Sequence, residues 1–398
     1  MFHNAGWKAN VESLEEFDCQ YSAVTVLRVL LRLEQEEQEE QKVGTPPLFG
    51  RFMDHNVERQ EEQPSIWKFE KEFMVNFIHQ KLKLQERFLE DQIHRAAGMI
   101  MTNATSVRLP EEGYGRASAL FPVYSMMNHS CMPNTKTLMN PDYSQEIIVQ
   151  VAIQKGEEVT NQYMKALKPT SLRRPFLREK WCFDCLCRRC RDPSELGSHL
   201  GSLLCQVARC GGTVVAVTPL HYSSEWHCQS CQGVVSKQEV SRLLESASQL
   251  VEETVGGEKV VEHHERVVHA LATVLHPHNW LMLGLKQELG LLYGSTLPWQ
   301  EMSRPAKERK MQCCQEVVEV LGQIEVGWST ARARVLGELT RARVLVAKEN
   351  AMAGRLGRQG LQKVLLQARM LMVHMAYQNN RMTGLKSNGI ELNGPLKK

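Results

Sequence analysis

The sequence predicts a mixed α+β protein, and three observations support this fold class. Residues 1–100 and the chain from residue 237 onward carry apolar side chains at helical spacing, whereas residues 145–153 alternate as in a half-buried strand. Eight cysteines between Cys131 and Cys231 fall in spacings that suit metal ligation. The chain has 398 residues, a length that corresponds to about two or three domains.

The first 100 residues are expected to be mostly helical. The segment Tyr21–Leu33 places four aliphatic side chains on one helical face: Val24, Leu27, Leu30 and Leu31. A second helix is expected over Ile66–Leu89, whose aromatic-rich face is typical of a buried core. Pro46 and Pro47 separate the two helices, because proline cannot donate the backbone hydrogen bond that a helix interior needs.

Strands are expected in the middle of the chain. Gln145–Ile153 alternates apolar and polar residues, Lys155–Glu157 reads as a turn, and Val159–Tyr163 is short enough for a second strand. From Lys237 onward the pattern is helical again, with about six helices separated by glycines and prolines. Consecutive helical pairs of this length are similar to a tetratricopeptide-like (TPR-like) array.

Composition and charge narrow the function classes. The net charge is +3, so no basic surface for nucleic acid is indicated, and direct nucleic-acid binding is not expected. The longest uncharged run, Ala117–Thr135, contains several polar residues and a proline, so no membrane span is expected. Residues 1–10 lack the apolar stretch of a secretory signal. We therefore expect an intracellular protein, in the nucleus or the cytoplasm, with reduced cysteines that bind metal.

Two groups of cysteines have zinc-like spacing. Cys185-x-Cys187-x2-Cys190 supplies three thiolates, and zinc usually takes four ligands, so a fourth must come from elsewhere. Cys131, the lone upstream cysteine in a polar segment, is the candidate. Cys205-x4-Cys210-x17-Cys228-x2-Cys231 supplies four thiolates and predicts a closed structural zinc site.

A third motif is Asn128-His129-Ser130-Cys131, followed downstream by Gly156–Thr160, by Tyr163 and by the first cysteine group. In this order the motifs resemble the SET domain of lysine methyltransferases with its post-SET zinc loop, and specifically the SMYD family. Asn103 and Ser125 also match the family's pattern. The insert Asp192–Gly197, with Trp226 and the second cysteine group, resembles the arthropod SmydA branch.

The resemblance implies a protein-lysine methyltransferase, with histones among its candidate substrates, that uses S-adenosylmethionine. It implies that Asn103, Ser125, Asn128 and His129 hold the cofactor, that Phe183 packs on its adenine, and that the Tyr163 hydroxyl lies beside the transferred methyl group. Cys131, Cys185, Cys187 and Cys190 would bind the post-SET zinc. A protein lysine is then the substrate, and the helical array is a surface for protein partners.

The resemblance also implies a domain order. Residues 1–100 would be a helical SET insert, 101–181 the C-terminal part of the SET catalytic core, 182–235 the post-SET and second zinc region, and 236–390 the TPR-like helical domain. The fold is thus expected to contain an incomplete β-rich SET core.

Two departures from the family pattern bear on activity. We expect that the N-terminal SET segment with its glycine-rich cofactor loop and the MYND zinc finger are lacking. Trp181 stands where many active members have a tyrosine. The alternative to an enzyme is therefore a noncatalytic interaction protein, in which two zinc sites and a helical array present a binding surface.

Overall fold

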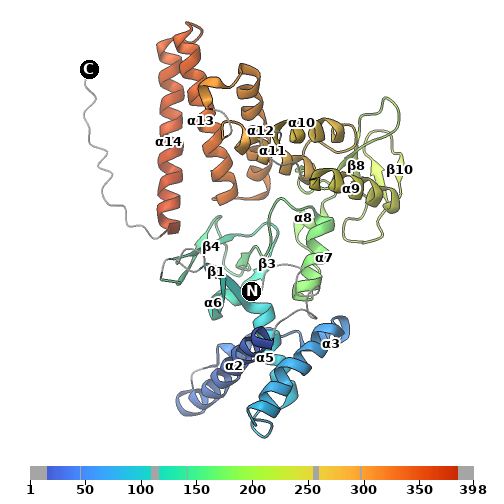
Figure 1. Ribbon diagram of the computed structural model, residues 1–398, viewed down its shortest axis with the longest axis vertical. Helices are drawn as coiled ribbons and strands as arrows, with labels where there is room; N and C mark the ends of the chain where they lie inside the picture. The colour runs from blue at the N-terminus through green and yellow to red at the C-terminus, as the bar shows by residue number, and fades with distance from the viewer. Residues whose placement is uncertain are drawn as a thin grey trace, which may run out of the picture. The chain divides into compact units, whose positions relative to one another are not determined.

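The computed structural model confirms a mixed α+β protein with a helical C-terminal region (Figure 1). It describes residues 16–44, 46–108, 116–140, 142–253, 260–295 and 298–383. Residues 1–15 and 384–390, at the outer edges of the expected first and last domains, lie outside the described residues. In the part of the chain that the structure describes, no helix combines the length and apolar character that a membrane span needs.

The chain packs into two compact units. The first, here called the N-terminal unit, comprises Met1–Asn128, Met139–Ile147 and Pro175–Asp184. The second, the C-terminal unit, comprises His129–Leu138, Ile148–Arg174 and Cys185–Lys398. The four-part division expected from the sequence stays a proposal.

The N-terminal unit is mainly helical. Its helical segments are α2 (Glu16–Val43), η2 (Phe49–Arg51), α3 (Asn56–Glu62), α4 (Pro64–Glu70), the π-helical turns η3 (Lys71–Val75) and η4 (Phe77–Lys81), α5 (Glu90–Asn103) and α6 (Pro122–Ser125). Helices α2 and α5 pack against each other over a shared core that includes Val26, Leu30, Phe69, Ile78 and Ile93.

Two details of this unit differ from expectation. The buried face of α2 carries Ala23, Val26, Val29 and Leu30, whereas Val24 and Leu31 are exposed. Leu27 and Leu30 therefore pack against the core as predicted, whereas the prediction was wrong for Val24 and Leu31, because aliphatic residues surround this helix. The second predicted helix ends at Lys81 and not at Leu89, because Lys83 adopts a φ of 58° that no continuing helix allows.

The strands form small antiparallel sheets. β1 (Ala104–Arg108) pairs with β2 (Arg116–Leu120), with Ser106 opposite Ser118. Two other two-stranded sheets join β3 (Asn128–His129) to β6 (Thr160–Asn161) and β4 (Thr135–Met139) to β5 (Gln145–Val149). The predicted strand over residues 145–153 is thus shorter, and the one over 159–163 keeps only two residues.

A four-stranded sheet follows two short elements. Helices α7 (Thr170–Trp181) and α8 (Arg188–Arg191) precede β7 (Leu203–Leu204), β8 (Thr213–Ala216), β9 (Trp226–Cys228) and β10 (Val234–Val235). The strand order in the sheet is β10-β9-β8-β7, and Val214 lies opposite both Leu203 and Cys228.

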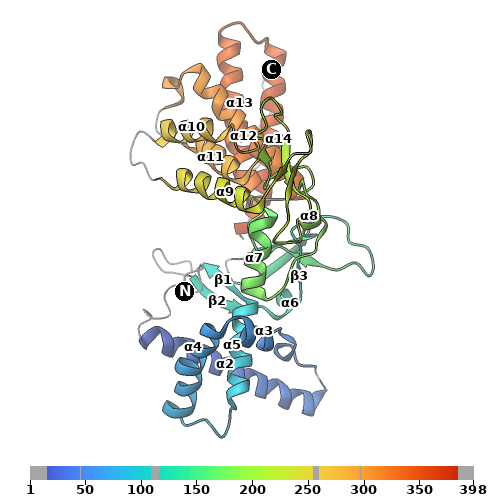
Figure 2. The same ribbon diagram turned by 90° about the vertical axis from the view of Figure 1, so that its right-hand side faces the viewer.

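Six helices complete the described part of the chain, as the sequence predicted. They are α9 (Lys237–Glu252), α10 (Val260–Leu271), α11 (Trp280–Leu292), α12 (Arg304–Ile324), α13 (Thr330–Met352) and α14 (Arg358–Thr383), with the short turn η6 (Trp299–Glu301) before α12. Helices α12, α13 and α14 lie side by side (Figure 2). Ser236, Ser303 and Ser329 cap the N-termini of α9, α12 and α13, because each hydroxyl accepts a backbone N–H of the first turn.

The small sheet and the first helices of this array share one core. Leu203 and Val214 of the sheet lie in the same buried cluster as Val240, Leu275 and Leu289. Leu203 also forms a β-bridge with Leu275. The cysteine-rich region and helices α9–α11 therefore fold against one another.

This shared core predicts the effect of Leu203→Ala. Leu203 is 1% exposed, so truncation should leave a cavity that lowers the free energy of unfolding by about 2–5 kcal/mol. Leu172→Ala, on an exposed position of α7, is the matched control. Urea titration followed by circular dichroism measures both; equal stability of the two variants would show that the sheet does not support the helices.

Candidate metal centres and active site

The first cysteine cluster brings together the four predicted residues. Cys131 follows β3, whereas Cys185, Cys187 and Cys190 lie in the segment that leads into and includes α8. The four sulfur atoms all lie within 4.8 Å of one another. The Cys131 sulfur is 3.9 Å from that of Cys185 and 3.6 Å from that of Cys190.

These distances fit a zinc ion. A tetrahedral zinc with Zn–S bonds of about 2.3 Å separates its sulfur ligands by about 3.8 Å. Three of the four cysteines are buried, and Cys187 is partly exposed. Four soft sulfur donors in a closed arrangement suit a structural zinc ion and leave no open position for catalysis.

Hydrogen bonds among the thiols of this cluster shift their pKa values in opposite directions. Hydrogen bonds from the Cys131 and Cys185 thiols lower the pKa of Cys190 to about 7. The same interactions raise the pKa of Cys131, which is a donor to its neighbours. The geometry therefore favours thiolate within the cluster, the form that binds metal.

The second cluster has comparable geometry at the edge of the four-stranded sheet. The sulfurs of Cys205 and Cys231 are 3.7 Å apart, and those of Cys210 and Cys228 are 3.6 Å apart. All four lie within 4.8 Å of one another. They too could hold a zinc ion. This cluster is more open than the first, because Cys231 is exposed.

Backbone geometry shapes this second cluster. The N–H groups of Ser230 and Cys231 point at the Cys228 sulfur, at 3.4 and 3.5 Å, and their hydrogen bonds help to lower the pKa of Cys228 to about 6. Gly212 lies so close that a Cβ atom there would be 2.7 Å from the same sulfur. The absence of a side chain at Gly212 is therefore required for the cysteines to converge.

His129 connects the first cluster to Tyr163. Its Nδ1 atom accepts the backbone N–H of Tyr163 at 3.0 Å, and its ring lies 5.2 Å from the tyrosine ring. Since Nδ1 is an acceptor, the ring hydrogen must be on Nε2, which is 3.2 Å from the Cys131 sulfur. His129 thus holds the Tyr163 backbone on one side and donates to a sulfur of the first cluster on the other.

This arrangement requires a neutral imidazole. The pKa of His129 is lowered to about 4, mainly by burial; Cys187 opposes this shift, and the positive charges of Arg173 and Arg189 contribute to it. At neutral pH the ring therefore keeps one acceptor and one donor nitrogen, as the two contacts require.

Two expected cofactor residues contact each other in the N-terminal unit. Asn103 ends α5, and its side-chain amide donates to the backbone oxygens of Met53 and Met99, both at 2.8 Å. Ser125, at the end of α6, donates its hydroxyl to the Asn103 backbone oxygen at 3.4 Å. The Asn103 side chain therefore has a clear structural function, and its contribution to cofactor binding stays a proposal.

The remaining expected residues are placed as follows. Asn128 is exposed in β3, and Phe183 is partly buried just after α7. Asn103, Ser125, Asn128 and Phe183 belong to the N-terminal unit, and His129 and Tyr163 to the C-terminal unit. Trp181, the departure from the family pattern, donates its indole N–H to the Thr102 backbone oxygen at 2.9 Å, which holds the ring in place.

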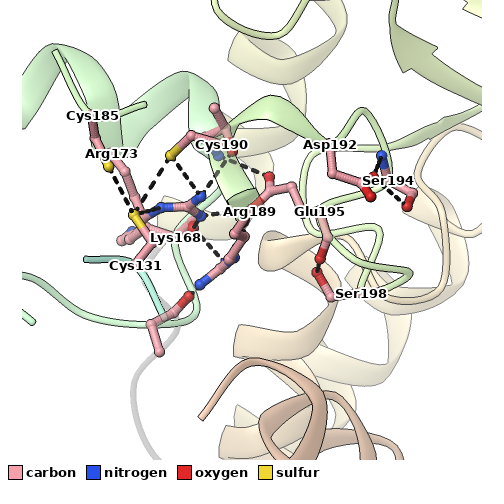
Figure 3. Close-up of polar contacts among 12 residues, drawn as sticks. Cys131, Lys168, Arg173, Cys185, Arg189, Cys190, Asp192, Ser194, Glu195 and Ser198 are labelled. Carbon is pink, nitrogen blue, oxygen red and sulfur yellow. Dashed lines mark hydrogen bonds and ion pairs between the residues drawn. The ribbon is translucent and has the colours of Figure 1, made fainter. Parts of the chain in front are cut away.

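Three buried charged residues beside the first cluster were not singled out from the sequence. Arg173 contacts the sulfurs of Cys131 and Cys190, and Glu195 joins Arg173 to Arg189 (Figure 3). Burial works against the charge of Arg173, but Glu195 and the nearby sulfurs outweigh it and raise the pKa of Arg173. The signal available in the sequence was the pair Arg188-Arg189 directly before Cys190, whereas Arg173 lies far from any cysteine in the sequence.

Parts of the chain are similar to known proteins. Residues 16–164 match the family model described as SET domain. The SET domain-containing protein SmydA-8, isoform A, of Drosophila melanogaster is 25% identical over 256 residues, which cover 64% of this chain and 55% of the fly protein. The histone-lysine N-methyltransferase SMYD3 of Homo sapiens is 31% identical over 128 residues, 31% of this chain and 28% of SMYD3. The N-lysine methyltransferase SMYD2-B of Xenopus laevis is 39% identical over 83 residues, 20% and 19% of the two chains.

Residues 16–164 are therefore similar to the SET domain. The relatives place it further: the chain is a SMYD-like SET-domain protein, related to proteins named as lysine methyltransferases. It spans about half of the length, 55%, of the fly relative.

The second cluster generates a prediction about metal content. We expect two zinc ions per chain, one at each cluster, and about one in Gly212→Ala, because the added Cβ displaces the Cys228 sulfur. Gly284→Ala, where a Cβ meets nothing within 4 Å, is the control and should keep both. Elemental analysis of purified protein measures the ratio; two zinc ions in Gly212→Ala would contradict the role given to this glycine.

Proposed function

We propose that this protein is an S-adenosylmethionine-dependent protein-lysine N-methyltransferase whose two cysteine clusters each hold a structural zinc ion. The observation that carries the proposal is the position of Tyr163. Its backbone is held by His129, which in turn contacts a sulfur of the first cluster. The names of the human and frog relatives, which are lysine methyltransferases, support the reaction class.

The cofactor, when bound, supplies a methyl group on a sulfonium that an uncharged amine can attack directly. The chain's own residues then have positioning functions. Asn103, Ser125, Asn128 and His129 would hold the cofactor, and Phe183 would pack on its adenine. The Tyr163 hydroxyl would orient the reacting groups. A low-dielectric surrounding favours loss of the proton from the substrate lysine before transfer, because burial disfavours the charged amine.

The substrate is proposed to be a lysine of a protein, with histones as the first candidates. The helices α9–α14 would contribute a surface for protein partners. Two clusters of reduced thiols suit an intracellular compartment, where disulfides are rare. Zinc contributes to folding in this account, because each cluster gathers thiolates that would otherwise repel one another.

Tyr163→Phe tests the proposed role of the hydroxyl. We expect methyl transfer to histones to slow by about tenfold or more, about 1.4 kcal/mol of transition-state stabilisation, with S-adenosylmethionine affinity nearly unchanged. Transfer of a radiolabelled methyl group and calorimetry measure the two quantities. Tyr222→Phe, at an exposed position, loses the same hydroxyl and should leave both unchanged.

Two results would contradict the proposal. An unchanged rate in Tyr163→Phe would remove this tyrosine from the mechanism. Absence of both cofactor binding and methyl transfer in the zinc-loaded protein, with histones and with cell-extract proteins as acceptors, would favour the noncatalytic interaction protein.

A further inference from the structure

The first cluster is surrounded by buried charges that do not balance. Arg173 and Arg189 are both 0% exposed, and Glu195 is 4% exposed. Arginine stays protonated in proteins, so two cations face one carboxylate and leave an excess of one positive charge. A buried charge is costly unless a partner compensates it. The excess positive charge therefore calls for an anion in direct contact.

The arginine geometry identifies that anion as the cysteine sulfurs. Arg173 directs its Nε–H at the Cys131 sulfur, 3.1 Å away, and one Nη2 hydrogen at the Cys190 sulfur, 3.5 Å away (Figure 3). The other edge of the guanidinium donates to Glu195 at 2.6 Å and to Thr170 at 2.8 Å. One edge of this planar group thus donates hydrogen bonds to sulfur atoms, and the other edge donates to oxygen atoms.

Glu195 holds the two arginines in place. Its Oε1 accepts the backbone N–H of Thr170, the first residue of α7, at 2.8 Å. Its Oε2 accepts from Arg173 Nη1 and from Arg189 Nε, at 2.6 and 3.2 Å. Arg189 also donates to the Ala166 backbone oxygen at 2.9 Å. One carboxylate therefore fixes α7 and both cations.

The turn Asp192–Ser198 is built to present this carboxylate. Asp192 accepts both the N–H and the hydroxyl of Ser194, at 2.8 and 2.7 Å. Ser198, which is buried, donates to the Glu195 backbone oxygen at 2.9 Å (Figure 3). Glu195 itself has a φ of 53°, a conformation that an L-residue keeps only when its surroundings enforce it.

We propose that Arg173 and Arg189, held by Glu195, form a counter-charge shell that retains zinc at the first cluster. Zinc with four thiolates carries a net charge of −2, and the two arginines with Glu195 contribute +1, so half of the buried negative charge is offset by groups directly beside the cluster. Hydrogen bonds from Arg173 also reduce the electron density that Cys131 and Cys190 offer to an attacking reagent. This inference rests on the zinc ion proposed for the first cluster.

The second cluster is an internal reference for the effect. Its sulfurs accept hydrogen bonds from the backbone N–H groups of Ser230 and Cys231. The second cluster is the more open of the two, because Cys231 is exposed, so each variant is compared with the natural chain at the same cluster. A variant that acts on the charge shell should change zinc release from the first cluster and leave the second unaltered.

The test is the rate of zinc release from the full chain during alkylation with N-ethylmaleimide, with the modified cysteines assigned by mass spectrometry. Arg173→Met should speed modification of the first cluster by about 10- to 100-fold. Arg173→Lys keeps the positive charge, so it should speed modification less than Arg173→Met does. Arg188→Met, on the exposed neighbour of Arg189, is the matched control and should behave as the natural protein. Arg189→Gln is the second variant to measure if Arg173→Met does not fold, and it should also speed release.

A spectroscopic measurement separates the charge shell from general loosening of the fold. In cobalt-loaded protein, Arg173→Met should move the thiolate-to-cobalt charge-transfer band to lower energy, because the sulfur loses a hydrogen bond, and Arg188→Met should not. The inference would be overturned if Arg173→Met released zinc at the same rate as the Arg188→Met control and showed an unchanged charge-transfer band. If Arg173→Met does not fold, the same comparison applies to Arg189→Gln. Less than one zinc ion in the natural chain would instead contradict the zinc sites themselves.

Discussion

The tetrathiolate cluster at Cys131 is the constraint on which the C-terminal unit depends. Cys131 and Cys185 are 54 positions apart in the sequence, yet their sulfurs are 3.9 Å apart. Bringing four thiolates together costs free energy, because like charges repel and the connecting chain loses entropy. A zinc ion at this cluster would supply the compensating attraction, and metal binding would then be coupled to folding.

Several other features follow from that cluster. His129 lies two residues before Cys131 and contacts its sulfur, so a fixed cysteine also fixes the imidazole that accepts the Tyr163 N–H. The strained turn with Glu195 links the cluster to the start of α7. Beyond it, the four-stranded sheet with the second cluster shares its core with α9–α11. The first cysteine cluster, Tyr163 and the helices α9–α11 are therefore connected within this unit.

Much of this was predictable because it is local in sequence. The six C-terminal helices follow from apolar periodicity, and most cysteine ligands follow from short spacings, which restrict where thiolates can point. Cys131 is the exception, because it lies 54 positions from Cys185 and was assigned as the lone upstream cysteine in a polar segment. The family resemblance of the motif at Asn128–Cys131 was confirmed by the SET-domain match over residues 16–164. The proposed roles of Asn103 and Phe183 still depend on that resemblance.

What the sequence did not predict depends on tertiary contacts. Val24 and Leu31 were wrongly assigned to the buried face of α2, because they are as apolar as the α2 residues that pack in the core. The strand over residues 145–153 ends at Val149, because its partner β4 is only five residues long. Arg173, Arg189 and Glu195 were overlooked because charged residues are usually exposed, and only the fold shows three of them buried around sulfur.

The most direct measurement is X-ray absorption spectroscopy at the zinc edge of the purified natural chain. If both clusters are tetrathiolate zinc sites, the first shell will fit four sulfur atoms per zinc at about 2.3 Å, with no nitrogen or oxygen ligand. A first shell that requires nitrogen or oxygen would contradict the account, because Cys131 would then not be joined through zinc to the cysteines after α7, and the position of His129 and Tyr163 would need another explanation.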